Sequence, residues 1–389
     1  MLRRMISSLA RRQQGAVIVR PVASRSDYRR FLSLPWRVNA QDRLWVPPLL
    51  RDVRAVLSSS HPFHRHAEVQ CFLAWRGSEA VGRVAAIVNR GHIDLYKEPV
   101  GFFGLFECEH DPEAAHLLLE TAAKFALDRG LDILRGPFNL STNEELASPG
   151  VLIEGFHRPP CLLMSHNPPY YAELMELAGF AKAKDTLAYW ISDAKRLSER
   201  LQRGLEKLEP RRGLRIRSLD MGRLNAEVAL IQEIYNDAWS RNWGFVPMTA
   251  QEISYLAEKL RPIVDPRLCV IAEIDGAPAG FGLAIPNLNQ ALKHINGRLY
   301  PFGFLQLLWH RRYIDEARMF ALGVKSAYRH KGLDTMLIMR VFTEATRMGI
   351  RRGECSAILE DNWAMRRGVE RIGAVADKTY RIYERRVRS

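Results

Sequence analysis

The order strand, helix, strand, strand, helix, strand, helix, strand occurs twice along this chain of 389 residues. Each round contains a hairpin, with turns at Arg76–Glu79 and at Asp275-Gly276. Glycines follow the predicted helices, as at Gly130 and Gly349, where a helix commonly ends. Two rounds of one order predict an α/β (α+β) chain built by internal duplication of a domain.

The length fits two domains of about 150–200 residues each. Every apolar run is shorter than the ~20 residues that a membrane helix needs. The five cysteines show no C-x-x-C spacing, which indicates neither a zinc site nor a disulfide framework and favours a reducing, cytoplasmic compartment. The expected parts are a basic N-terminal tail over 1–16, a first domain over 17–194, a linker over 195–213, and a second domain over 214–389 with an apolar insertion over 286–316.

A basic turn between a strand and a helix is the sharpest local signal. A strand over Met319–Val324 runs into this turn, a helix is expected over Thr335–Met348, and a further strand is expected over Ala357–Glu360. Amides at a helix start point outward unsatisfied, and the helix dipole adds partial positive charge, so the turn suits phosphate oxygens. An ordinary basic turn that binds nothing is the alternative. The predicted phosphate site consists of Leu322, Gly323, Val324, Arg329, His330, Lys331, Gly332, Leu333 and Asp334.

This turn resembles motif A of the GNAT acyltransferase superfamily, whose loop reads Arg/Gln-x-x-Gly-x-Gly/Ala. Arg329 and Gly332 fall on the pattern, whereas Asp334 stands where a small residue is usual and could cap the following helix. Downstream, the stretch Leu359–Asn362 resembles motif B, in which an Asn opens a helix. The resemblance therefore adds Asn362 to the expected cofactor-binding residues.

Many GNAT enzymes place a tyrosine seven positions after that Asn, as the acid for the leaving thiolate. Val369 stands at this position here. Tyr380 and Tyr383 on the next predicted strand are the candidate substitutes, with Tyr380 preferred. The alternative is that this part of the chain is an amphipathic strand pair with no catalytic role.

Blocks along most of the chain resemble a tandem-domain bacterial family of GNAT-related proteins that includes bacterial ceramide synthases. The blocks are Phe31–Val38, Trp45–Leu49, His61–Phe63, Gly101–Glu107, Gly136–Asn139 and Pro301–Gly303. The resemblance implies two tandem GNAT-like domains, each a mixed, mostly antiparallel sheet flanked by helices. It also implies transfer of a long-chain acyl group from acyl-CoA, as donor co-substrate, to the amine of a sphingoid base, without a metal.

The first domain carries a different turn at the equivalent position. The stretch Glu107–Pro112 is acidic and lacks glycine, so it should repel a diphosphate. We expect this domain to lack the cofactor site and to supply the acceptor side. Polar groups at its strand ends are candidates for binding the acceptor, or alternatively cap turns. They are Asn139, Ser141, Asn143 and Glu144.

The insertion over 286–316 contains an apolar, aromatic block flanked by arginines. Phe302 and Phe304 within it are candidate substrate-binding residues. Aromatic residues beside arginines suit a membrane interface or a lipid-chain tunnel, and a lid over the site would serve equally. A helix packed on the other domain is the alternative. Peripheral contact with the anionic inner-membrane surface is therefore a candidate interaction.

An amine must be neutral to attack a thioester, so an acidic residue or a water chain must take its proton. Glu360 and Glu107 are the candidate bases, and the amides of Leu322 to Val324 are expected to hold the thioester carbonyl. Two alternatives stay open: an acetyl-CoA-dependent N-acetyltransferase of a small molecule or protein, and a non-catalytic binding or regulatory protein. No nucleic-acid-binding motif accompanies the net charge of +14, so nucleic acid is not an expected partner, and no feature specifies an oligomeric state.

Overall fold

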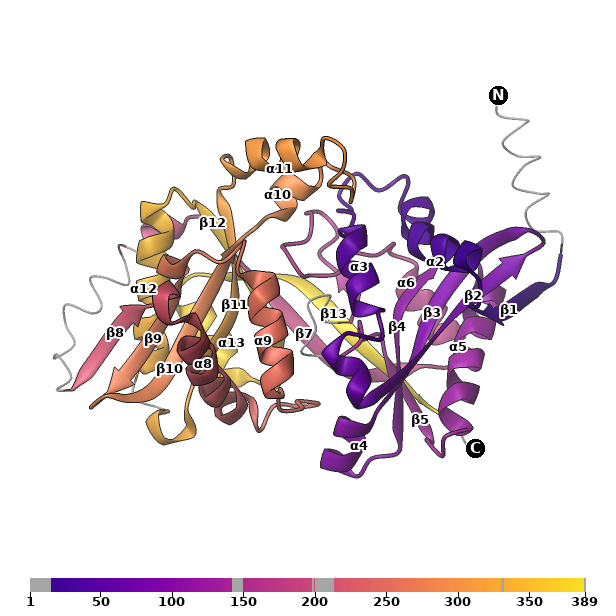
Figure 1. The fold of residues 1–389 in the computed structure, drawn as a ribbon, viewed down its shortest axis with the longest axis horizontal. Helices are drawn as coiled ribbons and strands as arrows, with labels where there is room; N and C mark the ends of the chain where they lie inside the picture. The colour runs from indigo at the N-terminus through magenta and orange to yellow at the C-terminus, as the bar shows by residue number, and fades with distance from the viewer. Residues whose placement is uncertain (1–14, 142–149, 198, 200–212, 330–331, 388–389) are drawn as a thin grey trace. The chain divides into compact units, whose positions relative to one another are not determined.

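The computed structural model describes residues 15–141, 150–197, 199, 213–329 and 332–387 (Figure 1). The chain forms two compact units. The first unit comprises Met1–Pro159, Ser165–Asp185 and Tyr380–Ser389, and the second comprises Pro160–Met164 and Thr186–Thr379. Most of the expected linker lies outside the described residues, as does almost all of the expected basic tail.

The first unit is built on a mixed sheet in the order β1-β2-β3-β4-β5-β13, in which only β4 and β5 pair in parallel. Its strands are β1 (Val17–Pro21), β2 (Ala67–Arg76), β3 (Glu79–Asn89), β4 (Val100–Cys108), β5 (Ile133–Gly136) and β6 (Val151–Glu154), together with part of β13 (Val375–Arg386). Its helices are α2 (Arg25–Val38), α3 (Leu50–Val56), α4 (Arg90–Tyr96), α5 (Pro112–Leu127) and α6 (Tyr171–Leu177).

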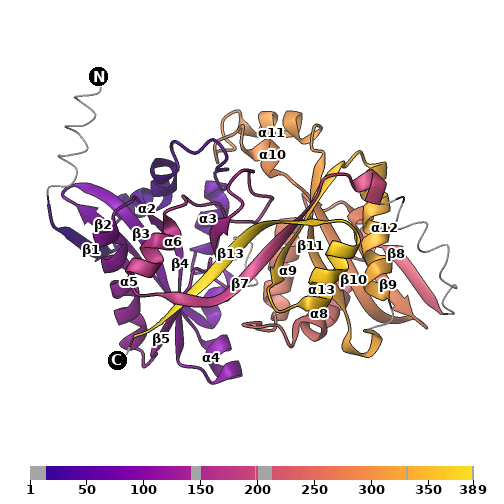
Figure 2. The same cartoon turned by 180° about the vertical axis from the view of Figure 1, so that it is seen from behind.

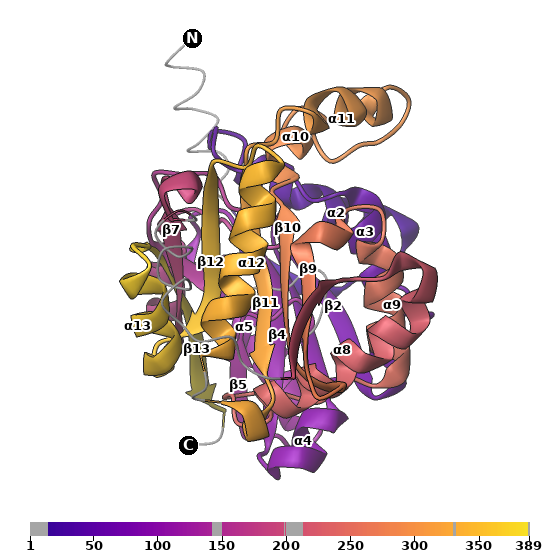
Figure 3. The same cartoon turned by 90° about the vertical axis from the view of Figure 1, so that its left-hand side faces the viewer.

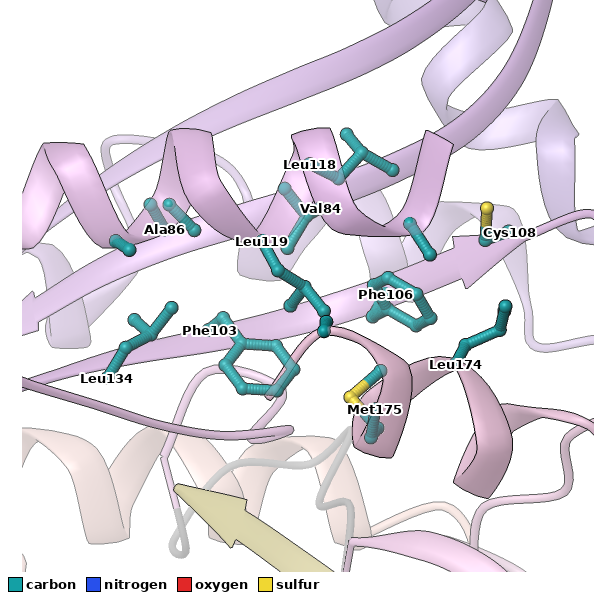
Figure 4. Packing of buried hydrophobic residues seen from close by; sticks show 14 of the residues in the cluster. Val84, Ala86, Phe103, Phe106, Cys108, Leu118, Leu119, Leu134, Leu174 and Met175 are labelled. Atoms are coloured by element: carbon teal, nitrogen blue, oxygen red, sulfur yellow. The ribbon is translucent and has the colours of Figure 1, made fainter. Parts of the chain in front are cut away.

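Helix α5 forms the core of the first unit by packing its apolar face on the sheet. Leu118 and Leu119 are fully buried in one cluster with Phe103 and Phe106 of β4 (Figure 4). The helix begins as its sequence predicts, because the side chain of Asp111 accepts a hydrogen bond from a first-turn N–H and a proline occupies the first helical position.

The second unit has a sheet in the order β8-β9-β10-β11-β12-β7, in which only β11 and β12 pair in parallel. Helices α12 and α13 cover one face, and α8 and α9 cover the other (Figures 1 and 2). Its strands are β7 (Ala181–Ile191, in part), β8 (Leu214–Ser218), β9 (Cys269–Ile274), β10 (Ala277–Pro286), β11 (Glu316–Val324) and β12 (Arg352–Leu359). Its helices are α8 (Leu224–Trp239), α9 (Ala250–Leu260), α10 (Asn289–Leu292), α11 (Gly303–Arg311), α12 (Leu333–Arg347) and α13 (Trp363–Arg371).

The last strand of each unit comes from the other half of the chain. The end of β7 pairs with β12, from Leu359↔Thr186 to Gly353↔Ile191. The end of β13 pairs with β5, as at Tyr383↔Gly136. The sequence order had led us to expect each of these strands to close its own half. That expectation was wrong. The apolar pattern of a strand predicts that it is a strand and which of its faces is buried, but it does not specify which sheet edge the backbone groups of the strand pair with.

The expected insertion contains α10 and α11, which stand beyond the strand ends of the second unit (Figure 3). None of the helices in the described ranges combines the length and the apolar character that a bilayer crossing requires.

Candidate functional site

Strands β11 and β12 separate partway along their length. They pair in parallel from Glu316↔Arg352 to Met319↔Cys355, and the recorded pairing stops there. At the same point β11 has a β-bulge. Its register with β10 steps from Leu283↔Ala321 to Ala284↔Met319, so that Phe320 is an extra residue without a partner in this register. Beyond Met319, the first residue of the predicted strand, β11 and β12 show no paired residues among those that the structure describes.

The turn after β11 leads into α12 through Gly332. This glycine is the residue before the first helical turn and has φ 71° and ψ 13°, a left-handed conformation that favours glycine. A Cβ atom at this position would meet no described atom within 4 Å. Having no side chain, Gly332 cannot accept hydrogen bonds from the first amides of α12, so the residue before this helix provides no side-chain cap.

Asp334 does not cap this helix. The helix begins at Leu333, so Asp334 lies inside its first turn and is exposed. The expectation of a helix beginning at Thr335 behind an Asp334 cap was wrong, because a left-handed glycine ended the turn two residues earlier than the side-chain preference suggested. A carboxylate at this position favours the helix through the dipole.

Two basic side chains connect the turn to α8. One of them, Arg329, is a residue that the sequence analysis predicted to bind phosphate. The guanidinium of Arg329 donates to the carbonyl of Ala238 at 2.8 Å and to that of Val324 at 3.4 Å. Lys325 pairs with Glu233. These contacts give Arg329 a role in shaping the turn. His330 and Lys331 lie outside the described residues.

The predicted strand residues differ in their surroundings. Leu322 and Val324 are half-buried and pack towards the α12 side of the sheet. Gly323 is buried against the ring of Trp239 on α8, and a side chain here would collide with that ring. Glycine at 323 is therefore needed for α8 to approach β11, and this requirement is separate from any role in binding.

The matching turn of the first unit is filled by the protein's own carboxylates. Asp111 accepts from the amide of Ala114 at 3.1 Å and is held by Arg76 at 2.8 Å. Arg76 also pairs with Glu113 at 2.7 Å. The start of α5 thus already has an anion in place, whereas the start of α12 has a glycine.

Helix α13 begins at Asn362, as the motif predicted. The Asn362 side chain accepts a hydrogen bond from the amide of Met365 at 3.2 Å. Glu360 lies between β12 and this helix, and its carbonyl accepts from Arg366 at 2.7 Å. Val369, where a tyrosine is usual, is buried in the core of the second unit.

The other predicted catalytic and acceptor residues lie in the first unit. Tyr380 is fully buried on the part of β13 that belongs there. Glu107 accepts a hydrogen bond from the hydroxyl of Tyr171 at 2.7 Å, and burial raises the pKa of its carboxyl while the charge of Arg83 opposes the rise. Asn139 accepts from the amide of Leu105 at 2.7 Å, which fixes β4.

Ser141 is the last described residue before a gap, and Asn143 and Glu144 lie outside the described residues. In the insertion, Phe302 and Phe304 are exposed. The structure therefore brings together Leu322–Val324, Arg329, Gly332, Leu333 and Asp334 on one strand, turn and helix of the second unit.

Sequence reasoning missed a buried charged pair beside the strand separation. Arg318 on β11 and Glu354 on β12 are register partners. Arg318 donates to Ser356 Oγ at 2.7 Å and to the carbonyl of Leu162 at 2.9 Å. Burial raises the pKa of Glu354, against the charge of Arg318 and a hydrogen bond from Ser356. The signal was a charged residue at the third position of each of two strands that are otherwise mostly apolar.

Within the described ranges, no group of three or more His, Cys, Asp or Glu side chains is arranged to hold a metal ion.

The sheet order, the separated strands and the glycine-started helix of the second unit define an acyltransferase of the GNAT type. Residues 228–374 match the sequence model of the acetyltransferase (GNAT) family. The chain belongs to this family, in its tandem-domain group that includes bacterial ceramide synthase, and is an acyl-CoA-dependent N-acyltransferase.

Two relatives are similar to almost the whole chain. The bacterial ceramide synthase of Caulobacter vibrioides is 39% identical over 377 residues, which cover 94% of this chain and 96% of the relative. Protein YghO of Escherichia coli K12 is 34% identical over 379 residues, which cover 95% of each protein.

Solved structures are similar in fold. A tandem GNAT protein from the clavulanic acid biosynthesis pathway superposes with a TM-score of 0.57 at 14% identity, covering 96% of this chain and 99% of the other. A GCN5-related N-acetyltransferase from Sphaerobacter thermophilus gives a TM-score of 0.52 at 15% identity, covering 96% of both. Both likenesses support the tandem fold that the sequence predicted.

Proposed function

We propose that this protein transfers a long-chain acyl group from acyl-CoA to the amine of a sphingoid base and so forms a ceramide-type amide. The observation that carries this proposal is the 39% identity, over nearly the full length of both chains, to the bacterial ceramide synthase of Caulobacter vibrioides. The reaction would take place in the cytoplasm, where acyl-CoA is available.

The diphosphate of CoA is proposed to bind at the start of α12. The amides of Gly332–Thr335 carry the partial positive charge of the helix start, and the left-handed glycine lets an anion come close. The equivalent position on α5 supports this choice by contrast, because Asp111 already accepts a hydrogen bond there. The second unit would thus bind the donor, and the first unit would serve the acceptor.

The thioester is proposed to lie along β11 beyond the Phe320 bulge. The end of the β11–β12 pairing at Met319 supports this proposal, in which backbone groups of Leu322–Val324 on that edge would bind the pantetheine amides and the thioester carbonyl. N–H groups aimed at this carbonyl would stabilise the oxyanion that forms when the amine attacks.

The amine attacks the carbonyl carbon, a C–N bond forms, the C–S bond breaks, and the amine loses a proton while the CoA thiolate gains one. Glu360, next to the end of β12, is our preferred proton acceptor. Glu107 and Tyr380 are the further candidates, the first as a base and the second as the acid for the thiolate. Both side chains are buried within the first unit, so each would need access to the reacting groups.

A second candidate function is N-acetylation of a small molecule or protein with acetyl-CoA. The description of the matching family as acetyltransferases favours it. The length of the acyl group separates the two candidates, because an enzyme built for a fatty acyl chain gains binding energy from each buried methylene, about 0.8 kcal/mol.

The deciding experiment is mass spectrometry of the products that purified protein forms from palmitoyl-CoA with sphinganine or its 3-keto form. We expect the N-palmitoyl amide and one equivalent of free CoA, and far less product with acetyl-CoA. Exclusive use of acetyl-CoA would favour the second candidate. Failure to release CoA with either donor and either base would contradict the proposed function.

A further inference from the structure

The segment from Tyr300 to Tyr313 turns its apolar side chains outward. Seven of the thirteen large apolar side chains that are exposed among the described residues lie in it. They are Tyr300, Phe302, Phe304, Leu305, Leu308, Trp309 and Tyr313. A surface helix of a globular protein normally directs its apolar stripe to the core, but on α11 the buried residue is Gly303. The burial of apolar area that usually holds such a helix in place is therefore missing on this face.

The base of the insertion is held firmly by polar contacts. Asn289 of α10 donates to the carbonyl of Pro160 at 2.9 Å, and Gln290 donates to Asp315 at 2.8 Å. The rings of His294 and His310 stack with centroids 3.8 Å apart, which joins the residues just after α10 to α11. The amide of Phe304 donates to the carbonyl of Leu299 at 2.8 Å. The apolar face is thus presented by an ordered element.

The charge of the same segment has one sign. No acidic residue occurs between Asn287 and Ile314, whereas Lys293, Arg298, Arg311 and Arg312 are all present and exposed. The guanidinium of Arg312 lies over the Trp309 ring at 4.4 Å. Tryptophan, tyrosine and arginine side by side match the headgroup level of a bilayer, where rings meet the acyl boundary and cations meet lipid phosphates.

We propose that this outward face, Tyr300–Tyr313, docks the protein on the surface of an anionic lipid bilayer. The apolar side chains enter the acyl boundary, and the flanking cations bind the lipid phosphates. The proposed contact is peripheral, because it is made by one surface segment and no described helix is long and apolar enough to cross a bilayer. The proposal does not depend on which amine is acylated. For a lipid-acylating enzyme it would bring the site to the surface from which a lipid substrate is drawn.

The test is co-sedimentation of the full chain with vesicles of phosphatidylglycerol and phosphatidylethanolamine, compared with phosphatidylcholine vesicles. The double variant Leu305→Ser/Trp309→Ser removes the centre of the proposed face. Its matched control is Leu177→Ser/Trp363→Ser. Leu305 and Leu177 are 63% and 60% exposed, and Trp309 and Trp363 are 54% and 57% exposed. Trp363 also has an arginine over its ring at 4.4 Å, that of Arg366.

We expect wild type and the control to bind anionic vesicles alike, and the Leu305/Trp309 variant to bind at least about 10-fold more weakly at unchanged melting temperature. Arg298→Ala and Arg312→Ala should each weaken binding about 5-fold, and added NaCl should weaken the wild type. Equal binding by the two double variants would overturn the proposal, and so would binding to neutral vesicles of the same strength.

A second copy of the chain is the competing occupant. A wild-type dimer in light scattering that dissociates in the Leu305/Trp309 variant, without vesicle binding by either, would overturn the bilayer assignment. The vesicles contain neither acyl-CoA nor a sphingoid base, so this result is independent of the product assay. A protein that binds vesicles but makes no amide would contradict the proposed function alone.

Discussion

Arg318 and Glu354 face each other as register partners on the two parallel strands of the second unit, and they are 4% and 2% exposed. The pair lies one residue before the recorded strand pairing ends. Glu354 Oε1 is buried without a hydrogen-bond partner among the described residues. Two charges in this position are expensive to bury, and the charge of Arg318 offsets part of the cost of burying that of Glu354.

The Glu354→Ala variant should lower the free energy of unfolding by about 3 kcal/mol, because it leaves the Arg318 guanidinium buried without its carboxylate. Glu258→Ala, at an exposed position on α9, should change it by less than about 0.5 kcal/mol. Urea denaturation measures both. The double variant Arg318→Met/Glu354→Leu should lose less free energy of unfolding than the sum of the losses in Arg318→Met and Glu354→Leu measured singly. Strict additivity would show that the two charges are not coupled.

The Gly332→Glu variant should abolish measurable acyl-CoA binding in calorimetry. The added side chain has open space but carries negative charge to the helix start, and the left-handed φ costs about 1–2 kcal/mol of stability for a residue with Cβ. The matched control is Gly349→Glu at the other end of α12. Gly349 also has a left-handed φ, and a Cβ atom there would likewise meet no described atom within 4 Å.

Both variants incur the same kind of cost from the left-handed backbone, and they differ in where the added charge lies. Gly349→Glu should lose more stability, because its carboxylate lies at the negative end of the helix dipole and that of Gly332→Glu lies at the positive end. We expect Gly349→Glu to bind acyl-CoA as the wild type does. Retained binding by Gly332→Glu would show that the diphosphate lies elsewhere, and lost binding by both would point to damage to α12 rather than to a ligand contact.

The Glu360→Gln variant should lower kcat by about 10²–10⁴-fold while the Kd for acyl-CoA stays unchanged, because the amide cannot take the proton of the amine. Glu107→Gln is the companion variant, since Glu107 is the other candidate base. Steady-state kinetics with calorimetry separates the two roles. Undiminished kcat in Glu360→Gln together with a large loss in Glu107→Gln would move the base to the first unit.

Asp185 and Arg381 make a pH-dependent contribution to stability. Arg381 donates to both carboxylate oxygens, at 2.8 and 3.0 Å. Burial alone would raise the pKa of Asp185, but the hydrogen bonds from Arg381 and Lys182 hold it below its ordinary value. A lowered folded-state pKa stabilises the protein above the unfolded value of about 3.9, and the gain is lost as pH falls through the folded value.

We therefore expect Asp185→Asn to lower the free energy of unfolding by about 2 kcal/mol at pH 7. The difference from wild type should shrink as pH falls below about 3.9. Denaturant melts at a series of pH values measure this. A difference that stays constant down to the lowest pH at which both proteins fold would exclude the ionised carboxylate as its source.

The sequence predicted the element order and the two-domain α/β class because local signals specify them. Asp111-Pro112 starts α5, Gly130 follows it, and the two hairpin turns lie where they were expected. Asn362 was placed at a helix start by the resemblance to motif B, and its side chain accepts a hydrogen bond from a first-turn amide there. Such signals depend on neighbours within a few residues, which a single sequence contains.

Features that depend on distant partners were missed. Strand β11 was expected from Met319 and β12 from Ala357, but they begin at Glu316 and Arg352. Each omitted start contained one residue of the Arg318–Glu354 pair, since a charge inside an apolar run looks like a strand boundary until its partner is known. The start of α12 was misplaced for a related reason, because the left-handed φ of Gly332 is a property of the folded turn.

The path of β7 and β13 has a consequence for how the protein can be divided. A cut within 195–213 would leave a first fragment without the C-terminal residues that pair with β5, and a second without the residues that pair with β12. Each fragment would present a bare strand edge and a loose apolar tail, which invites aggregation. Neither half should be expressible alone as a soluble protein, although the two halves produced together should recover the missing strands from each other. The two units therefore depend on each other's half of the chain for a complete sheet.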